Sequence, residues 1–262
     1  MTEIKVNGLV IFDRELGEND KLLTILTERY GKLFVIAKGA KSIKNRNMCC
    51  THLFSYATFG IRRKGNYYYL VDSDLNENFF SVRNDILKLS LATYVCDVVN
   101  HVAQEGVCED EILRLALNTI YAISMDRYEL ELIRAAFQIR IISEIGMSPD
   151  VFSCSKCGCE DVDCGYLDLI DGVIVCNECR NKDNFTIEEN PFTERGLQKP
   201  IALINKSVLD SIKYIIGSDV KKYLSFTLEG EGWKLFYDLS EKFLINQLER
   251  SFYSLEFYKS MI

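Results

Sequence analysis

Six of the ten cysteines lie within 26 residues, between Cys154 and Cys179. They include two Cys-x-x-Cys pairs, Cys154 with Cys157 and Cys176 with Cys179, which are separated by 18 residues. Such spacing is typical of a structural zinc site, in which two turns each direct two thiolates at one tetrahedral ion. We therefore predict that Cys154, Cys157, Cys176 and Cys179 hold a structural Zn²⁺.

Other uses of the cysteines are less consistent with the sequence. The first residues, MTEIKVNG, lack a secretory signal, and no apolar run approaches the roughly 20 residues that span a bilayer. We therefore expect a cytoplasmic protein without membrane partners, and cytoplasmic thiols stay reduced. A thioredoxin-like redox site needs only one Cys-x-x-Cys pair. Cys159 and Cys164 remain unassigned, as bystanders, alternative ligands or part of an iron–sulfur arrangement.

The charges are unevenly distributed. The whole chain has a net charge of −7, but residues 29–71 contain nine basic residues and no Asp or Glu. The rest of the chain has 22 basic and 38 acidic residues. This asymmetry favours a polyanion-binding face over a merely solvated surface, because soluble surfaces usually mix both signs. The predicted nucleic-acid-binding cations are Lys32, Lys38, Lys41, Lys44, Arg46, Arg62, Arg63 and Lys64.

The first 75 residues read as five short strands with no strong helical pattern between them. The predicted strands cover residues 4–11, 22–27, 32–38, 53–62 and 67–75. Gly31 and Gly65 lie at the predicted hairpin turns. A closed antiparallel barrel buries the apolar faces and removes free edges, and five strands suit either an OB-type or an SH3-like barrel.

From Ser81 the hydrophobic period changes to that of helices. Helices are predicted over residues 86–106, 109–125, 128–145, 205–216, 221–228 and 232–252. Pro149 and Pro191 bracket the cysteine-rich segment, which we interpret as a module inserted into the helical region. The predicted domains are a barrel (1–80), a helical domain in two parts (81–148 and 191–262) and the zinc module (149–190).

Aromatic residues accompany the basic segments and are candidates for stacking on bases, as in OB folds. They are Phe34, Tyr56, Phe59 and Tyr67 to Tyr69. Strand alternation places Tyr68 opposite to its two neighbours. We expect most of these rings in the core and one or two on the surface.

No motif for catalysis is recognisable. The sequence has no Walker-type loop, no Gly-x-Ser-x-Gly and no His-Glu-x-x-His. Its two histidines, His52 and His101, stand outside any nucleophile or metal motif. We therefore predict that the protein is not an enzyme.

Several segments together resemble the bacterial RecO family of DNA repair and recombination mediators. They are GENDKLLTILTERYGKLFVIAKGAKS near the N-terminus, the helical region, the Cys-x-x-Cys pairs and the ending SLEFY. The resemblance follows the whole chain in order. Its most specific parts are Asp20-Lys21-Leu22 and Ala37-Lys38-Gly39-Ala40.

The resemblance implies an α+β protein: an N-terminal OB fold, then a helical domain with an inserted four-cysteine zinc module. It further implies binding of single- and double-stranded DNA, annealing of complementary strands, and loading of RecA together with RecR. In this family the helical domain binds the acidic tail of single-strand binding protein, for which Arg134 and Arg140 are the nearest candidates. The implied location is the cytoplasm, in association with the nucleoid.

Two other functions remain open on the sequence. The chain could be a zinc-stapled interaction protein whose basic barrel binds RNA or an acidic protein partner. It could also be a nuclease without a recognisable motif.

Overall fold

The computed structural model describes residues 3–65, 67–182, 201–228 and 232–262. Its described residues form two compact units. Unit 1 is Met1–Leu130 together with Phe252–Ile262, and unit 2 is Glu131–Ser251. The last helix of the chain is therefore part of the same unit as the N-terminal strands.

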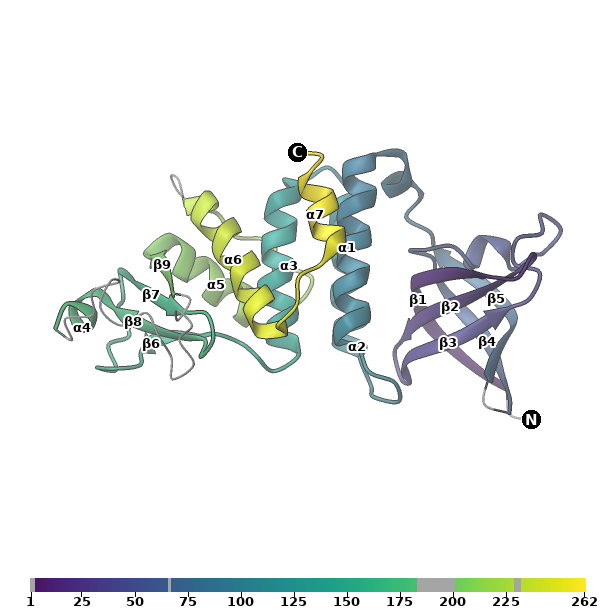
Figure 1. Cartoon of the computed structure of the whole chain (residues 1–262), viewed down its shortest axis with the longest axis horizontal. Coiled ribbons are helices and arrows are strands. Elements are labelled where there is room, and N and C mark those ends of the chain that lie inside the picture. Colours follow the sequence, from purple (N-terminus) through teal and green to yellow (C-terminus); the bar gives the residue numbers. More distant parts are fainter. Residues whose placement is uncertain (1–2, 66, 183–200, 229–231) are drawn as a thin grey trace. The chain divides into compact units, whose positions relative to one another are not determined.

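Five strands of unit 1 close into a barrel in the order β1-β2-β3-β5-β4 (Figure 1). Their bounds are β1 Glu3–Leu16, β2 Asp20–Thr27, β3 Gly31–Ala37, β4 Tyr56–Lys64 and β5 Tyr67–Glu77. Closure comes from β1, which pairs with both β2 and β4, and from the parallel pairing of β3 with β5. The barrel is OB-like, which confirms the predicted fold class and decides between the two barrel types.

The barrel core follows from strand alternation. In β3, Leu33, Val35 and Ala37 are buried whereas Phe34 is exposed. The interior is almost wholly apolar, and burial of its apolar surface stabilises the folded barrel in proportion to the area buried. Its buried members are Val6, Val10, Leu23, Ile25, Leu33, Val35, Ala37, Ala40, Cys50, Ala57, Phe59 and Ile61.

The turn before β3 lies against the helical part of unit 1. Gly31 has φ +60°, and a Cβ at this position would lie 2.1 Å from the carbonyl oxygen of Gln104. Only glycine fits both the left-handed backbone and this close approach. The next residue, Lys32, donates its backbone N–H to the same carbonyl at 2.9 Å.

The helical elements of unit 1 follow the barrel. They are the short 3₁₀ helices η1 (Met48–Cys50) and η2 (Phe80–Asn84), then α1 (Ile86–Val102), α2 (Asp110–Ser124) and α7 (Tyr253–Lys259). Asp85 caps α1, because its side chain accepts from the N–H groups of Leu87 and Lys88. α7 returns to pack beside α1 (Figure 1). No helix in the described ranges is both long enough and apolar enough to cross a membrane.

Unit 2 combines three helices with a small sheet. The helices are α3 (Leu130–Glu144), α5 (Lys206–Gly217) and α6 (Gly232–Leu248). The sheet has the order β6-β8-β7-β9, with β6 Asp150–Cys154, β7 Cys164–Asp168, β8 Val173–Cys176 and β9 Ile201–Asn205. The short helix α4 (Asn177–Lys182) follows β8. β7 and β8 form the predicted hairpin around Asp171-Gly172.

Two predicted helices differ from the structure. Residues 221–224 form turns and residues 225–228 have no regular structure, so no helix spans 221–228. The helix predicted over 232–252 is shorter in the structure, because α6 ends at Leu248 and Glu249 has φ +49°. The next helix, α7, begins only at Tyr253. The predicted boundary at 190/191 lies outside the described residues.

Candidate metal centre and nucleic-acid interface

The four predicted ligand cysteines form one cluster. The Sγ atoms of Cys154, Cys157, Cys176 and Cys179 all lie within 4.8 Å of one another. The Cys157 and Cys176 sulfurs are 3.8 Å apart. Four thiolates at about 2.3 Å from a tetrahedral ion are about 3.8 Å from one another. The cluster therefore fits a metal ion of that size.

Secondary structure positions each thiol. Cys154 ends β6 and Cys176 ends the neighbouring strand β8, so their pairing places both at one end of the sheet. Cys157 follows in the tight turn after β6, and Cys179 lies on α4. Cys159 and Cys164 do not belong to the four-thiol cluster, since the Cys159 thiol lies near the Asp161 carbonyl and Cys164 pairs with Asn205.

The backbone around Cys154 favours its thiolate. Burial opposes ionisation of this thiol, but backbone N–H groups of Cys176, Cys157 and Lys156 outweigh burial and lower its pKa to about 6. One of these donors, the Cys176 N–H, lies 3.3 Å from the Cys154 sulfur. Hydrogen bonds to the charged form stabilise it, and a deprotonated sulfur is what a metal requires.

The basic loop, residues 38–47, follows β3 and is held by side chains of the specific sequence motif. The Asp20 carboxylate accepts from the Gly39 N–H at 2.8 Å. Gly39 itself has φ +62°, which suits glycine. The Asn45 amide donates to the Lys38 carbonyl at 2.9 Å, across the loop. The loop is thus tied to the barrel, and the side chains of Lys38, Lys44 and Arg46 are exposed.

Lys21, next to Asp20, also acts in the scaffold. Its ammonium lies 2.7 Å from a carboxylate oxygen of Asp13 and 3.2 Å from the Thr51 carbonyl. It therefore links β1 and β2 to the segment after η1. The Asp20 and Lys21 side chains therefore stabilise the barrel and the start of the basic loop through contacts within unit 1. Neither side chain is part of the proposed ligand-binding surface.

The eight predicted cations fall into two groups. Three are paired within unit 1: Lys32 donates to the Asn100 carbonyl at 2.7 Å, Lys41 lies 2.8 Å from Glu15, and Arg62 lies 2.9 Å from Glu3. The other five are exposed and have no carboxylate partner within the described part of the chain. These five are Lys38, Lys44, Arg46, Arg63 and Lys64.

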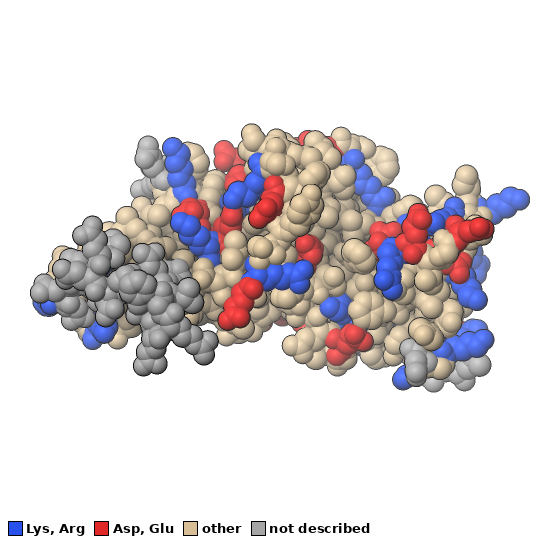
Figure 2. All heavy atoms as spheres, viewed as in Figure 1, with Lys and Arg blue, Asp and Glu red and all other residues tan. Residues whose placement is uncertain are grey.

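Barrel closure brings the two basic segments to opposite sides of Tyr69. The Lys38 ammonium lies 5.6 Å from the centroid of the Tyr69 ring. On the other side, Arg62 in β4 pairs in register with Tyr69 in β5. The loop after β3 and the β4–β5 hairpin therefore lie on either side of Tyr69, whereas Arg63 lies 5.8 Å from the centroid of the Tyr68 ring, on the other face of β5. On the face in Figure 2, lysines and arginines gather over the barrel, with acidic side chains among them.

Two of the predicted aromatic residues are exposed, as expected, but fewer of the others are fully buried than predicted. Phe59 is fully buried, and Tyr56, Tyr68 and Tyr69 are partly buried. Phe34 and Tyr67 are exposed. Two rings therefore remain on the surface, one on β3 and one on β5. The sequence interpretation did not include Phe12, an exposed ring on β1.

Comparisons with known proteins agree over the whole chain. Family models for "Recombination protein O N terminal" and "Recombination protein O C terminal" match residues 1–79 and 83–193. The DNA repair protein RecO of Acetivibrio thermocellus is 30% identical over 263 residues, covering 100% of this chain and 98% of the relative. The chain belongs to the RecO family.

Other RecO proteins show similar agreement. The DNA repair protein RecO of Alkaliphilus metalliredigens is 30% identical over 190 residues, or 72% of this chain and 77% of the relative. That of Caldanaerobacter subterraneus is 25% identical over 257 residues, or 98% of each chain. The protein is therefore a DNA repair protein of the RecO family.

Arg134, one of the two arginines considered for a RecO partner tail, is occupied within unit 2. It is 2% exposed. Its guanidinium contacts Glu131 at 2.8 Å, Glu241 at 3.2 Å and the Gln138 side chain at 2.9 Å. An acidic tail would have to displace the carboxylates of Glu131 and Glu241 to reach Arg134, so Arg134 is not part of the proposed interface.

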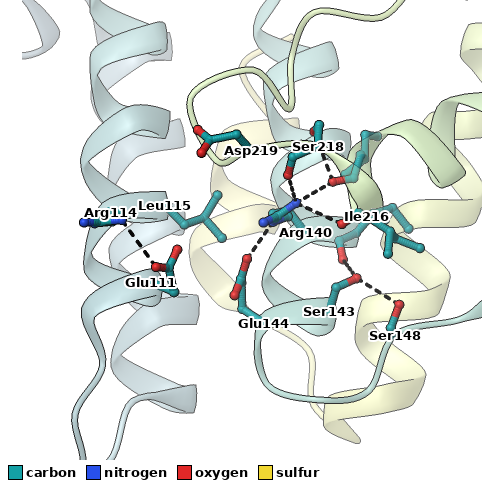
Figure 3. Close-up of polar contacts among 12 residues, drawn as sticks. Glu111, Arg114, Leu115, Arg140, Ser143, Glu144, Ser148, Ile216, Ser218 and Asp219 are labelled. Carbon is teal, nitrogen blue, oxygen red and sulfur yellow. Dashed lines mark hydrogen bonds and ion pairs between the residues drawn. The ribbon is translucent and has the colours of Figure 1, made fainter.

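Arg140 closes the end of helix α5 (Figure 3). One terminal nitrogen donates to the carbonyls of Ile215, Ile216 and Ser218 at 2.7, 3.1 and 2.6 Å. Its Nε lies 2.6 Å from Glu144. A cation at a helix C-terminus satisfies unpaired carbonyls and the helix dipole. Arg140 is therefore structural in this conformation, and it too is left out of the proposed interface.

Replacing Arg140 with methionine is expected to lower the free energy of unfolding of unit 2 by about 2–4 kcal/mol, because three backbone carbonyls and Glu144 lose their partner. Urea unfolding followed by circular dichroism measures this effect. Arg114→Met is the matched control, since Arg114 also pairs with acids on its own helix but its side chain is 59% exposed. A control change above about 0.5 kcal/mol, or no change for Arg140→Met, would contradict the assignment.

Proposed function

We propose that this RecO-family chain is a non-enzymatic DNA-binding mediator of recombinational repair. In this proposal it binds single- and double-stranded DNA through its barrel, anneals complementary strands, and helps RecR to load RecA. The observation that carries the proposal is that the basic loop and the hairpin tip of β4 and β5, which together hold five exposed cations, lie on either side of Tyr69.

The supporting chemistry is electrostatic. Each cation that meets a phosphate releases a condensed counterion, which drives binding without reading the sequence. Annealing needs no catalytic residue, because lowering the repulsion between two strands and holding them together is sufficient. The proposed interface consists of Lys38, Lys44, Arg46, Arg63 and Lys64, with Lys32, Lys41 and Arg62 as supporting residues.

The metal proposed for the cysteine cluster is a structural Zn²⁺. Four thiolates leave no coordination position for water or substrate, which favours a structural over a catalytic role. When bound, the ion would join the end of β6, the end of β8 and α4. The module has short strands, so much of its local stability would come from the metal.

The proposed partners come from membership of the family. They are RecR, single-strand binding protein and DNA, in the cytoplasm and at the nucleoid. Neither candidate arginine supports a particular site for the acidic tail of single-strand binding protein. The proposal therefore names this partner without assigning its binding residues.

Fluorescence anisotropy of a labelled single-stranded oligonucleotide, titrated at several salt concentrations, tests DNA binding. Five cations predict that log K falls against log salt with a slope near −3.5, from about 0.7 per phosphate. Binding that is absent at low salt, or independent of salt, would contradict the proposal.

The same assay separates the other functions. A structured RNA or an acidic protein that binds more tightly than DNA would favour the zinc-stapled interaction protein. Incubation of the DNA with Mg²⁺ or Mn²⁺ tests for a nuclease, and we expect the DNA to stay intact.

A further inference from the structure

A hollow of about 470 Å³ lies on the outer face of β1, β2 and β3, beside the end of α1. All of these elements belong to unit 1. Among the described residues that line it are Phe12, Arg14, Thr24, Lys32, Phe34 and Asn100. The scaffold and the cation pairs described above do not account for the two exposed phenylalanines.

Strand register places the two rings on the same face. Phe12 pairs with Thr24, and Thr24 pairs with Phe34. Residues in register on neighbouring strands point to the same side of a sheet. The backbones of β1 and β3 are two strand spacings apart, or about 10 Å, with the short Thr24 side chain between them. Phe12 is 49% exposed and Phe34 is 41% exposed, whereas Thr24 between them is buried. A planar group can therefore reach the exposed parts of the two rings above Thr24.

The charge of the hollow favours an anionic ligand. Its described lining includes the cations Arg14 and Lys32 and contains no carboxylate. The Lys32 ammonium donates to the Asn100 carbonyl at 2.7 Å, and this hydrogen bond fixes the Lys32 side chain as one wall of the hollow. Arg14 is exposed and lies two residues from Phe12 on the same face of β1. The amide of Asn100 adds a group able to donate and accept hydrogen bonds.

The hollow and the basic loop are close enough to serve one strand. Phe34 and Lys38 are four residues apart along β3 and the start of the loop, a span of roughly 13 Å. Lys38 in turn borders Tyr69. A backbone that follows the loop cations can therefore extend to the hollow.

This inference rests on the proposed function and deepens it. We propose that the hollow between Phe12 and Phe34 binds an unpaired base of single-stranded DNA, while the basic loop holds the adjoining phosphates. Aromatic faces stack on any base, whereas a base in a duplex has both faces stacked and its edge paired. The hollow therefore distinguishes single strands from duplex, and a base must leave it in order to pair with a complementary strand.

The double variant Phe12→Ala/Phe34→Ala is the direct test. We expect its affinity for an oligothymidine strand to fall by tenfold or more, since loss of stacking on one base has an effect of about this size. Affinity for a duplex of equal length should change less than about twofold. The salt slope for the single strand should stay near about −3.5, because no cation is removed.

Phe80→Ala is the matched control, because Phe80 is an exposed phenylalanine of the same unit outside the hollow. It should leave both affinities unchanged. An oligonucleotide that carries 5-iodouracil supplies a second measurement. On irradiation it should crosslink to peptides that contain Phe12 or Phe34, and mass spectrometry of the digest identifies them.

The outcomes separate this inference from the proposed function. Unchanged single-strand affinity in the double variant, an equal loss for both DNA forms, or crosslinks confined to other peptides would overturn the base-binding hollow alone. Binding of the wild-type protein to neither DNA form at low salt would overturn the proposed function and the hollow with it.

Discussion

Replacing Cys154 and Cys176 with serine is expected to abolish metal binding and to unfold the cysteine module locally. Together the two substitutions remove one thiolate from each Cys-x-x-Cys pair, so neither pair can hold the ion as before. Structural zinc sites of this kind contribute on the order of 10 kcal/mol to folding. The loss is therefore far larger than that from an ordinary surface substitution.

The local structure explains why the loss should stay within the module. β7 and β8 have only five and four residues. Few apolar side chains of the cysteine module are buried, among them Val151, Leu167 and Ile174. This small core cannot replace the metal. The barrel of unit 1 has its own apolar interior and needs no contribution from the ion.

Three measurements check this prediction. Elemental analysis should give about one zinc per chain for the wild type and none for the double variant. Limited proteolysis should cut the variant within residues 150–182 and leave the barrel intact. Cys159→Ser/Cys164→Ser is the matched control, because both residues lie outside the four-thiol cluster. The assignment is wrong if the control loses its metal or the first variant keeps it.

The four-cysteine cluster and the barrel were predictable because their signals are local. Each Cys-x-x-Cys pair is one turn, and two such pairs separated by 18 residues are typical of a metal site. Likewise, β3 shows its buried face through the alternation of Leu33, Val35 and Ala37. Period and spacing can be recognised within a few residues, without knowledge of the rest of the chain.

The state of the cations was not predictable, because their partners are distant in the sequence. Lys32 meets a carbonyl 68 residues away, and Arg62 meets Glu3 across 59 residues. Basic composition alone therefore overestimated the number of free cations. β9 was missed for the same reason, since its five residues pair with β7, a strand distant from it in the sequence. In addition, helix α5 begins directly after β9, so the helical pattern obscures the short strand.

The outer face of β1 was missed for a different reason. The predicted first strand ended at Ile11, whereas β1 continues to Leu16. The continuation is stabilised by pairing with β2, from Asp13 with Leu23 to Leu16 with Asp20. Tertiary pairing thus overrides weak strand propensity, and it places Phe12 and Arg14 on the barrel surface.

Reversing the charge of Lys38, Lys44 and Arg46 with glutamate is expected to lower the affinity for single-stranded DNA by at least about a hundredfold near 0.1 M salt. Three of the five exposed cations are lost, and three carboxylates take their place beside the phosphates. With two cations left, the salt slope should fall from about −3.5 to about −1.4. Lys41 is left unchanged because it pairs with Glu15.

The fold should survive this change, because the hydrogen bonds that shape the loop come from other groups. Asp20 holds the Gly39 N–H, and Asn45 holds the Lys38 backbone carbonyl, which the substitution retains. All three replaced side chains are exposed. Thermal unfolding of the variant should therefore resemble that of the wild type.

The matched control reverses three exposed lysines of unit 2, Lys221, Lys222 and Lys234, and so changes the net charge by the same amount. If the basic loop is the interface, the control keeps most of its affinity and its full salt slope. An equal loss in both variants would instead mean that overall charge, and not the loop beside Tyr69, governs binding. Because the two variants share one net charge, the difference between their salt slopes measures the contribution of the loop alone.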